Sequence, residues 1–324
     1  MNILITGGCG YIGSNLSYKL SNKHKIFIID NLCKANKNNY KFLIKKKNIL
    51  IYIKNLININ FLKKILIKNK IDIIIHLAAY KFVNESLRYK KKYFENNIGC
   101  CKAIIESIKG SKVRKIIFGS SASVYKKSNL QPYEEHHKLK ANNPYGNTKI
   151  ACEKILKKFS KKKKLQVIIL RYFNPIGYIS NSCLEKLERN EQIIPKFIKS
   201  LITKKKFHLY GGNLNTKDGF PERDFFHISD LVRAHEAVIK YNFNDKFNIF
   251  NIGSGKSTST LTLIKKIENE LKVKNNYVIG KYRSGDVDKC YASIYKAKKY
   301  LRWKPKYSIN EIILSIKKSV KHYK

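Results

Sequence analysis

The stretch Ile3-Leu-Ile-Thr-Gly-Gly-Cys-Gly-Tyr-Ile-Gly13 decides the fold that this sequence predicts. A short apolar segment, typical of a buried β-strand, runs into three glycines spaced Gly7-x-x-Gly10-x-x-Gly13, where a helical pattern begins. Glycines at these positions let the backbone turn tightly and approach a pyrophosphate, whose charge the N-terminus of the next helix favours. A glycine turn without a ligand is the alternative, but the preceding strand and the following helix favour dinucleotide binding.

Asp30 indicates which dinucleotide is expected. It closes the second apolar segment about 20 residues after the glycines, where an acidic residue accepts a hydrogen bond from a ribose 2′-hydroxyl. A carboxylate there would repel the 2′-phosphate of NADP. NAD is therefore the expected cofactor.

The first half of the chain alternates apolar strands with helical stretches, which is the pattern of a parallel sheet covered on both faces. The predicted strands are residues 3–6, 25–29, 50–53, 71–77, 115–118 and 166–170. The predicted helices include residues 12–20, 60–69, 93–107 and 145–159. The fold class is therefore α/β, a doubly wound parallel sheet of Rossmann type, whose ligands bind at the carboxyl ends of the strands.

A chain of 324 residues is long for one compact core, so we expect a second, smaller substrate-binding lobe. After Pro175 the alternation loosens into a turn-rich stretch, residues 210–221. A strand at residues 225–228, a helix that begins at Ser229 and a strand at 247–251 follow. The predicted domains are an NAD-binding domain at residues 1–175, with returning segments at about 222–252, and a substrate-binding lobe at 176–324.

Tyr145 and Lys149 stand four residues apart, so on a helix they share one face. An ammonium beside a phenol favours the phenolate and lowers its pKa from roughly 10 towards neutrality. A partly buried Tyr beside a solvated Lys is the simpler alternative, but the glycine motif in the same chain favours proton transfer beside a dinucleotide. The strand end at residues 119–125 places hydroxyls where ligands bind, and a third member of a Ser…Tyr…Lys set is expected there.

Two further motifs resemble functional sites without meeting their requirements. Gly253-Ser-Gly-Lys-Ser-Thr258 looks like the end of a Walker A loop, but Phe250 occupies the position of its first glycine. We therefore exclude nucleotide hydrolysis and expect the serines and threonine at 257–259 to cap the next helix. Glu134-Glu-His-His137 has no Zn ligand pair at suitable spacing nearby, so we expect a solvated loop and no metal site.

The charge is strongly positive, with 67 Lys+Arg against 22 Asp+Glu, a net charge of +45. A nucleic-acid or anionic-surface partner is one interpretation. However, only eight of these cations are Arg, and Lys is spread along the whole chain together with Asn and Ile, which share A/T-rich codons. Genome composition is the favoured explanation, and we expect no specific nucleic-acid partner.

The seven cysteines are odd in number and form no C-x-x-C pair, which indicates reduced thiols in a cytoplasmic compartment. The chain runs from Met1 straight into the glycine motif, so no signal peptide is expected. No apolar run reaches transmembrane length, so we expect no membrane partner.

With these motifs in place, the sequence resembles the UDP-glucose 4-epimerases of the extended short-chain dehydrogenase/reductase group over nearly its whole length. The matching stretches are Thr6-Gly-Gly-Cys-Gly-Tyr-Ile-Gly-Ser14, Asp30-Asn-Leu-Cys33, His76-Leu-Ala-Ala79 with Lys81, Glu85-Ser86, Asn96-Asn97, Ser120-Ser-Ala-Ser-Val-Tyr125, Pro144-Tyr-Gly146, Arg171-Tyr-Phe-Asn-Pro175, Arg223-Asp224 and Arg283-Ser-Gly-Asp286. The Arg171 stretch and the two late Arg motifs narrow the resemblance to nucleotide-sugar enzymes.

The resemblance implies a reversible oxidation at C4 of a UDP-sugar. Tyr145 and Ser121 would take the proton of the 4-hydroxyl while hydride passes to NAD, and Lys149 would hold the ribose hydroxyls. The implied cofactor contacts are Gly7, Gly10, Tyr11, Ile12, Gly13, Asp30, Asn31, Asn55, Leu56, Leu77, Ala78, Ala79, Lys81, Asn97, Tyr145, Lys149 and Phe173. The implied substrate contacts are Ser121, Tyr145, Asn174, Gln192, Tyr210, Arg223, Arg283, Asp286 and Cys290. A homodimer through a helix bundle is also implied.

Within the implied substrate site, Arg223 and Arg283 would clamp the diphosphate, because a guanidinium binds it as a bidentate fork. Asn174 and Asp286 would hold the uridine diphosphate and its ribose. Tyr210 would lie near the uracil.

Three residues depart from the resemblance. Asn55 stands where many relatives carry an adenine-contacting Asp, and Gln192 stands where many carry Asn. Cys290 stands where relatives restricted to unacetylated sugars carry Tyr. A small residue there leaves room for a 2-acetamido group, so activity on UDP-N-acetylglucosamine and UDP-N-acetylgalactosamine is expected as well.

Two alternatives stay open. A UDP-glucuronate 4-epimerase or decarboxylase is the nearest one, whereas a dehydratase would need carboxylates in the segment around Ser121, which has none. The alternative from another class is an RNA-binding protein on the same scaffold, with the Lys surplus as its interface. An intact set of Ser121, Tyr145 and Lys149 argues against a purely binding role.

Overall fold

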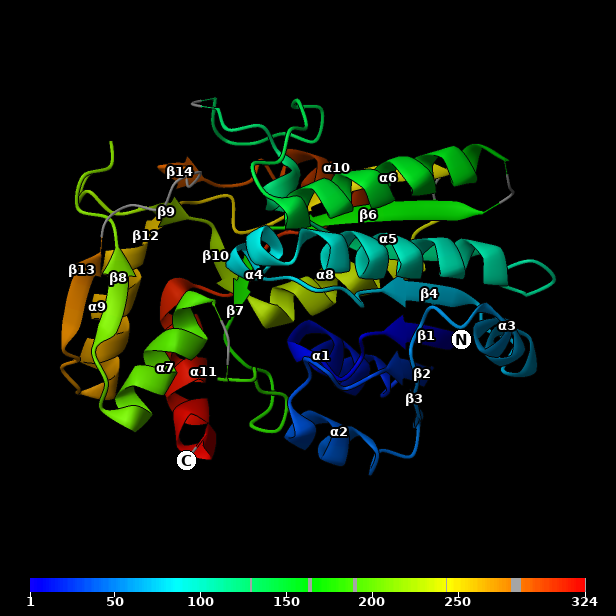
Figure 1. Ribbon diagram of the computed structural model, residues 1–324, viewed down its shortest axis with the longest axis horizontal. Coiled ribbons are helices and arrows are strands. Elements are labelled where there is room, and N and C mark those ends of the chain that lie inside the picture. The colour runs from blue at the N-terminus through cyan, green and yellow to red at the C-terminus, as the bar shows by residue number, and fades with distance from the viewer. Residues whose placement is uncertain (129, 163–164, 189–190, 243, 281–286, 324) are drawn as a thin grey trace.

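A computed structural model describes residues 1–128, 130–162, 165–188, 191–242, 244–280 and 287–323 of the chain. It contains a seven-stranded sheet with helices on both faces. A smaller lobe lies beyond the carboxyl ends of the strands, at the left of Figure 1. This arrangement leaves the loops at the strand ends between the sheet and the lobe.

All seven strands of the large sheet are parallel, in the order β11-β6-β5-β4-β1-β2-β3. Their bounds are β1 Asn2–Thr6, β2 Lys25–Asp30, β3 Ile49–Ile53, β4 Ile73–His76, β5 Lys115–Ser121, β6 Gln166–Tyr172 and β11 Phe247–Ile252. The direction in which successive strands are added reverses between β1 and β4. In such sheets this reversal opens a crevice at the carboxyl ends of the strands.

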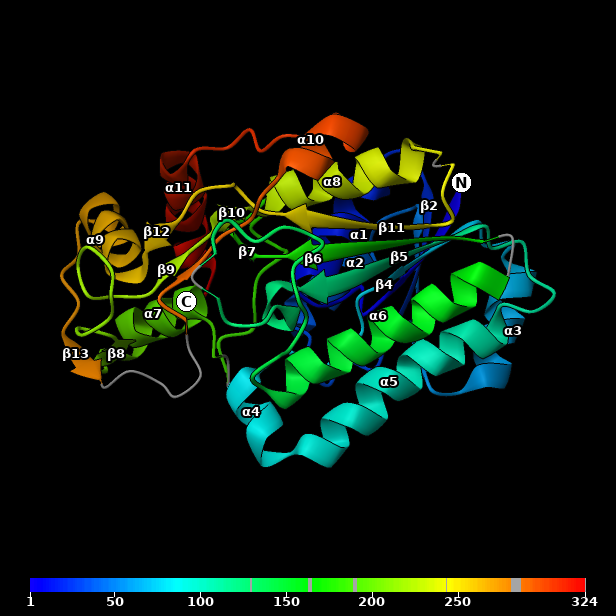
Figure 2. The ribbon, with the colours of Figure 1, turned by 90° about the horizontal axis from the view of Figure 1, so that it is seen from above.

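Helices cover the sheet in two layers (Figure 2). One layer holds α1 Tyr11–Leu20, α2 Lys37–Leu43 and α8 Ile228–Lys240, and the other holds α3 Ile59–Lys68, α5 Lys90–Ser107 and α6 Pro144–Lys162. Successive side chains of a strand point to opposite faces, so Ile3 and Ile5 pack in the first layer while Leu4 packs in the second. Both faces are buried, which is why the strands are apolar at nearly every position.

The smaller lobe is built from short strands and three longer helices. Its elements are α7 Ile193–Thr203, β8 Phe207–Tyr210, β9 Glu222–Arg223, β12 Thr258–Ser259, α9 Thr260–Leu271, β13 Tyr277–Gly280, β14 Lys289–Cys290 and α11 Ile309–Val320. The strand pair β7 Asn174–Ile176 and β10 Phe225–His227 lies between the lobe and the sheet. The remaining elements are α4 Val83–Arg88, α10 Tyr295–Leu301 and two 3₁₀ turns, Ala122–Val124 and Lys321–Tyr323.

The predicted fold class is confirmed, and the six strands and four helices predicted for the first half are all present. β11 comes from the second half of the chain and completes the sheet beside β6. The division of the chain at residue 175 stays a prediction. The short strands of the lobe were not predicted, because strands of two to four residues are too short to show a hydrophobic period.

A buried ion pair fixes α6 to the sheet. Arg171 of β6 donates from Nε and Nη2 to the two carboxylate oxygens of Glu153 on α6, at 3.1 and 2.8 Å, and the two side chains are only 2% and 5% exposed. Nη1 of Arg171 donates to the Tyr125 hydroxyl and the Glu135 carbonyl. The Ser120 hydroxyl donates to Glu153 from β5. The position of α6 is therefore set by hydrogen bonds as well as by apolar packing.

Replacing Arg171 with Met should lower the free energy of unfolding by about 3–5 kcal/mol, because the Glu153 carboxylate would stay buried without its partner. Urea unfolding of the purified variant measures this loss. The double variant Arg171→Met/Glu153→Met should recover most of it, since no charge is then left buried.

The exposed pair Lys317–Glu270 serves as a control, because its oppositely charged atoms are equally close, at 2.7 Å. Lys317→Met should cost less than about 1 kcal/mol. A double variant as unstable as Arg171→Met alone would contradict this account of the buried pair.

Candidate active site

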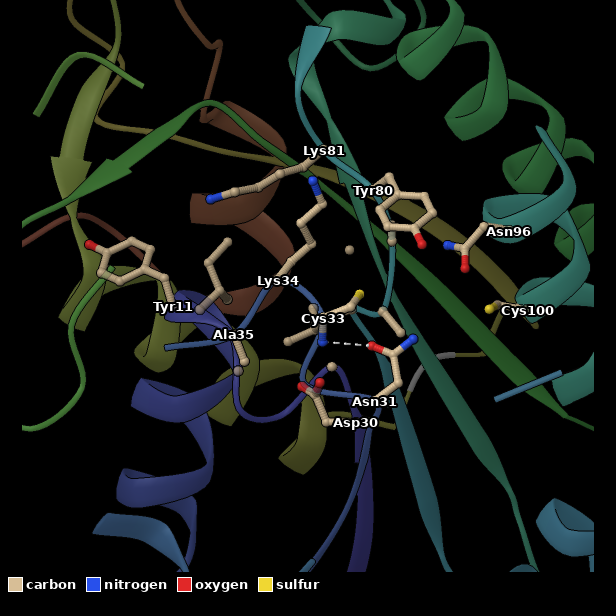
Figure 3. Close-up of a pocket in the computed structure, with 18 of the residues that line it drawn as sticks. Tyr11, Asp30, Asn31, Cys33, Lys34, Ala35, Tyr80, Lys81, Asn96 and Cys100 are labelled. Carbon is tan, nitrogen blue, oxygen red and sulfur yellow. Dashed lines mark hydrogen bonds between the residues drawn. The ribbon is translucent and has the colours of Figure 1, made fainter. Parts of the chain in front are cut away.

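A cavity of about 390 Å³ opens at the carboxyl ends of β1, β2, β4 and β5, where the strand order reverses (Figure 3). We refer to it as the first cavity. It is lined by fifteen of the predicted cofactor residues: Gly7, Gly10, Tyr11, Ile12, Gly13, Asp30, Asn31, Asn55, Leu56, Leu77, Ala78, Ala79, Lys81, Tyr145 and Lys149. Segments far apart in the sequence therefore meet around one space of the size that small-molecule ligands occupy.

The glycine loop has the shape that a dinucleotide needs. Gly7 has φ +70°, and a Cβ on it would stand 2.8 Å from the backbone nitrogen of Ala78. A Cβ on Gly13 would collide with the Gly7 carbonyl, so the helix could not lie this close to the strand. Gly10 is the N-cap of α1 and lines the cavity with Tyr11, so no side chain blocks the positive end of the helix. These features suit an anionic diphosphate.

Two backbone N–H groups hold the carboxylate of Asp30 at the end of β2. Its carboxylate accepts hydrogen bonds from the backbone N–H groups of Cys9, at 3.0 Å, and Leu32, at 2.8 Å. Burial raises its pKa, while the two hydrogen bonds act in the opposite direction. Each carboxylate oxygen keeps a lone pair for a ribose hydroxyl. Figure 3 shows Asp30 beside Asn31, whose side chain accepts a hydrogen bond from the Cys33 N–H.

Tyr145 and Lys149 lie on the first turns of α6, and both line the first cavity. Lys149 is buried, and its Nζ donates to the Gly119 carbonyl at 2.7 Å. The same Nζ lies 4.6 Å from the centroid of the Phe118 ring and 5.9 Å from that of Tyr145. Tyr145 and Lys149 therefore share one helix face, as predicted, although the ammonium of Lys149 is directed at the Gly119 carbonyl.

The expected lowering of the Tyr145 pKa is not found in the protein alone. Burial raises the pKa of Tyr145 to about 12, and a hydrogen bond with Ser121 acts in the opposite direction. Burial also lowers the pKa of Lys149 to about 8. The spacing of the two residues predicted that Lys149 stabilises the phenolate of Tyr145. At this site, the cost of removing a phenolate from water is larger than that stabilisation.

Asn97 lies behind the wall of the first cavity. It is only 2% exposed, and its side chain accepts from the Tyr80 N–H and donates to the Tyr80 carbonyl and to Thr148. It thus joins α6 to the loop after β4, next to Lys149. Asn96 lines the cavity, although the sequence assigned a cofactor contact only to Asn97. Direct contact between Asn97 and a cofactor stays a prediction.

A second cavity, of about 300 Å³, lies between the sheet and the smaller lobe. It is lined by Asn174, Gln192, Tyr210 and Arg223, four of the predicted substrate residues. Phe173, which was predicted as a cofactor contact, also lines this cavity. Nη1 of Arg223 donates to the carbonyls of Glu222 and Val287, which hold the guanidinium beside the cavity.

Cys290 lies on β14, directly opposite Arg223 of β9 in the strand register. It is half-buried, and its carbonyl accepts a hydrogen bond from the Asp224 N–H. Arg283 and Asp286 were also predicted to contact the substrate, but both lie outside the described residues. Their roles stay predictions.

The Walker-like loop binds a carboxylate of its own chain. Asp224 is fully buried and accepts hydrogen bonds from the N–H groups of Ser254, Gly255 and Ala292, and from the Ser254 hydroxyl. A Cβ on Gly253 would collide with this carboxylate. Ser259 caps α9, as expected. The loop therefore uses its N–H groups to join the lobe to β11, a role that the sequence motif did not reveal.

Two other expectations concern metals and membranes. No group of three potential metal ligands occurs among the described residues, and the Glu135 side chain, expected to be solvated, accepts from the Asn251 N–H at 2.8 Å. It is therefore anchored to β11. Within the part of the chain that the structure describes, no helix combines the length and apolarity needed to cross a membrane.

Glu185 is a site residue that the sequence did not indicate. It is the described residue that lines both cavities, and its carboxylate accepts from Lys81 Nζ at 2.8 Å. It stands in an irregular stretch between β7 and α7 that contains no recognisable motif. Only the spatial meeting of the two cavities identifies it.

Known proteins of similar sequence and structure agree with this geometry. The NAD dependent epimerase/dehydratase family matches residues 3–253. UDP-glucose 4-epimerase of Drosophila melanogaster is 32% identical over 96% of this chain and 93% of its own length. The structure of UDP-glucose 4-epimerase from Bifidobacterium longum in complex with NAD+ and UDP superposes with a TM-score of 0.92 at 29% identity, covering 99% of this chain and 98% of that one.

A second solved structure is similar over the whole length. UDP-glucose-4-epimerase from Stenotrophomonas maltophila, with bound NAD and formylated UDP-arabinopyranose, has a TM-score of 0.93 at 27% identity and covers 100% of this chain and 98% of its own. The bound NAD in both structures and the description of the family confirm the expected cofactor. This chain belongs to the NAD dependent epimerase/dehydratase family.

Proposed function

We propose that this chain is a UDP-glucose 4-epimerase, which interconverts UDP-glucose and UDP-galactose by NAD-dependent oxidation and reduction at C4. The observation that carries the proposal is the meeting of the two cavities. Tyr145 lines the first, Arg223 lines the second, and Glu185 lines both. A nucleotide sugar across them would place its sugar at the junction, beside Tyr145, and its diphosphate near Arg223.

Tyr145 would move the proton. Its side chain lines the first cavity and its hydroxyl is hydrogen-bonded with Ser121, so the two hydroxyls would form a path from the sugar 4-hydroxyl. When bound, NAD+ supplies a reversible hydride acceptor for C4 and a positive charge. Tyr145 would accept the 4-hydroxyl proton as C4 is oxidised and return it when C4 is reduced, so that no net redox change results.

The pKa values indicate how much stabilisation the phenolate needs. Lowering the pKa of Tyr145 from about 12 to near 8 requires roughly 5 kcal/mol. A unit positive charge about 4 Å away supplies about 4 kcal/mol at the effective dielectric near a protein surface. Lys149, whose Nζ lies 5.9 Å from the centroid of the Tyr145 ring, is itself held at the Gly119 carbonyl with a pKa of about 8. We therefore infer that Tyr145 becomes an effective base only when the cofactor adds its charge.

The second cavity would hold the part of the substrate that does not react. Arg223 offers a guanidinium fork for the diphosphate, and Tyr210 and Phe173 offer ring surfaces for the base. Inversion at C4 requires the hydride to leave C4 from one face of the sugar and to return to the other face. The sugar must then turn about its held diphosphate, while Tyr145 stays in place.

Tyr145→Phe should lower kcat by at least about 100-fold, the usual contribution of a positioned proton-transfer group. The protein should still bind UDP, because Arg223 and the second cavity are unchanged. Conversion of UDP-galactose to UDP-glucose measures the first quantity, and calorimetry measures the second. Tyr295→Phe, on an exposed ring of α10, is the matched control and should retain full activity. Unchanged turnover in Tyr145→Phe would show that the base is elsewhere.

We also propose that the enzyme accepts 2-acetamido sugars, because Cys290 is small and lies opposite Arg223 in the strand register. Cys290→Tyr should lower kcat/KM for UDP-N-acetylgalactosamine by at least about tenfold, the usual steric discrimination of a pocket. The kcat/KM for UDP-galactose should change little. Cys290→Ala keeps the side chain small and should leave both values unaltered. Equal losses on both substrates in Cys290→Tyr would contradict the proposal.

The resemblance supports two further proposals, a homodimer and a cytoplasmic location. The seven cysteines support the second, because all stand as thiols in the structure, the form favoured in a reducing compartment.

A further inference from the structure

The chain between β7 and α7 crosses from the sheet to the lobe, and we call its residues 177–188 the strap. Two asparagines, both fully buried, hold the middle of the strap. Asn15 of α1 donates to the Cys183 carbonyl at 3.1 Å. Asn39 of α2 donates to the Leu184 carbonyl and accepts from the Leu184 N–H, both at 3.0 Å. The backbone immediately before Glu185 is therefore fixed to the layer that carries the glycine loop.

This anchoring places Glu185 at the junction of the two cavities. Its side chain is only 6% exposed, and its carboxylate pairs with Lys81 Nζ at 2.8 Å. The same Nζ donates to Gln192 in the second cavity at 3.4 Å. Figure 3 shows Lys81 at the edge of the first cavity, extending toward the side where Tyr11 lies. Glu185, rather than Lys81, is the member of this pair that lines both spaces.

The inference rests on the proposed function, because that function puts the sugar at this junction. The C4 hydroxyl must reach Tyr145 in the first cavity while the diphosphate lies near Arg223 in the second. The sugar would then turn beside Glu185, and the charge of a ring substituent would affect its binding, because two charges a few ångströms apart interact strongly.

We propose that Glu185 is a specificity-determining residue that excludes sugars carrying a carboxylate at C6. Two negative charges at the junction repel one another, whereas the neutral hydroxymethyl group of glucose or galactose can donate a hydrogen bond to Glu185. The carboxylate also pairs with Lys81, whose Nζ reaches Gln192 in the second cavity and could otherwise neutralise an acidic sugar. Glu185 thus repels an acidic sugar and, by pairing with Lys81, prevents that cation from compensating the charge of the sugar.

Glu185→Gln should relax this discrimination, because it keeps the shape of the side chain while removing its charge and releasing Lys81. The test compares the dissociation constants of UDP-glucose and UDP-glucuronate on NAD-loaded protein, by calorimetry. Wild-type protein should bind UDP-glucuronate at least about tenfold more weakly than UDP-glucose. In Glu185→Gln this ratio should shrink by about tenfold or more. An unchanged ratio, in a variant with the thermal unfolding midpoint of the wild type, would overturn the proposal.

Two variants sharpen the comparison. Glu270→Gln removes the same charge from the exposed pair with Lys317, and should leave the ratio at its wild-type value. Adding Lys81→Gln to Glu185→Gln should reverse most of the gain in UDP-glucuronate affinity. A gain that survives this second substitution would overturn the role given to Lys81. Because each result is a ratio of two ligands, a general change in cofactor affinity cancels.

Failure of this inference is distinguishable from failure of the proposed function. Wild-type protein that epimerises UDP-glucose while Glu185→Gln keeps the wild-type ratio would refute only the role of Glu185. Wild-type protein that neither binds nor converts UDP-glucose would refute the proposed function, and with it the position of the sugar.

Discussion

The buried ion pair between Arg171 and Glu153 is the interaction on which the active site depends. It joins β6 to α6, the helix that carries Tyr145 and Lys149, and Ser120 of β5 donates to the same carboxylate. An ion pair of this kind adds little net stability, because desolvation of both charges offsets their attraction. The ion pair instead fixes the position of α6, because the two parallel hydrogen bonds of a guanidinium–carboxylate pair allow one orientation. An apolar contact would let the helix shift along the strand. Tyr145 and Lys149 thereby keep their height above the strand ends.

Buried polar side chains also fix the backbone where the sheet and the smaller lobe join. Asn15 and Asn39 bind the backbone of the strap, and Asp224 binds the backbone after β11 and β14. These polar side chains are all fully buried, so each would be costly to leave without its partners. They hold the walls of the two cavities together beside an apolar core that runs from the sheet into the lobe.

The sequence predicted the large sheet well, because most of its strands are apolar runs buried on both faces and bounded by turn residues. Most of the residues that it predicted as cofactor contacts line the first cavity, since the glycines and Asp30 act through local backbone geometry. It was less informative for the lobe, whose two-residue strands have no period. The lowered pKa expected for Tyr145 was wrong for the protein alone, because spacing along a helix says nothing about burial.

What the sequence by itself determined is therefore local: the strand–glycine–helix unit, the acidic residue at the end of β2, and the shared helix face of Tyr145 and Lys149. Each follows from the order of residues within about thirty positions, the span of one βαβ unit. Only the tertiary structure decided that Glu185 lies between two cavities and that a Walker-like loop encloses Asp224. Contacts between residues far apart in the chain produce no regular spacing in the sequence, because they are set by how the layers and the lobe pack.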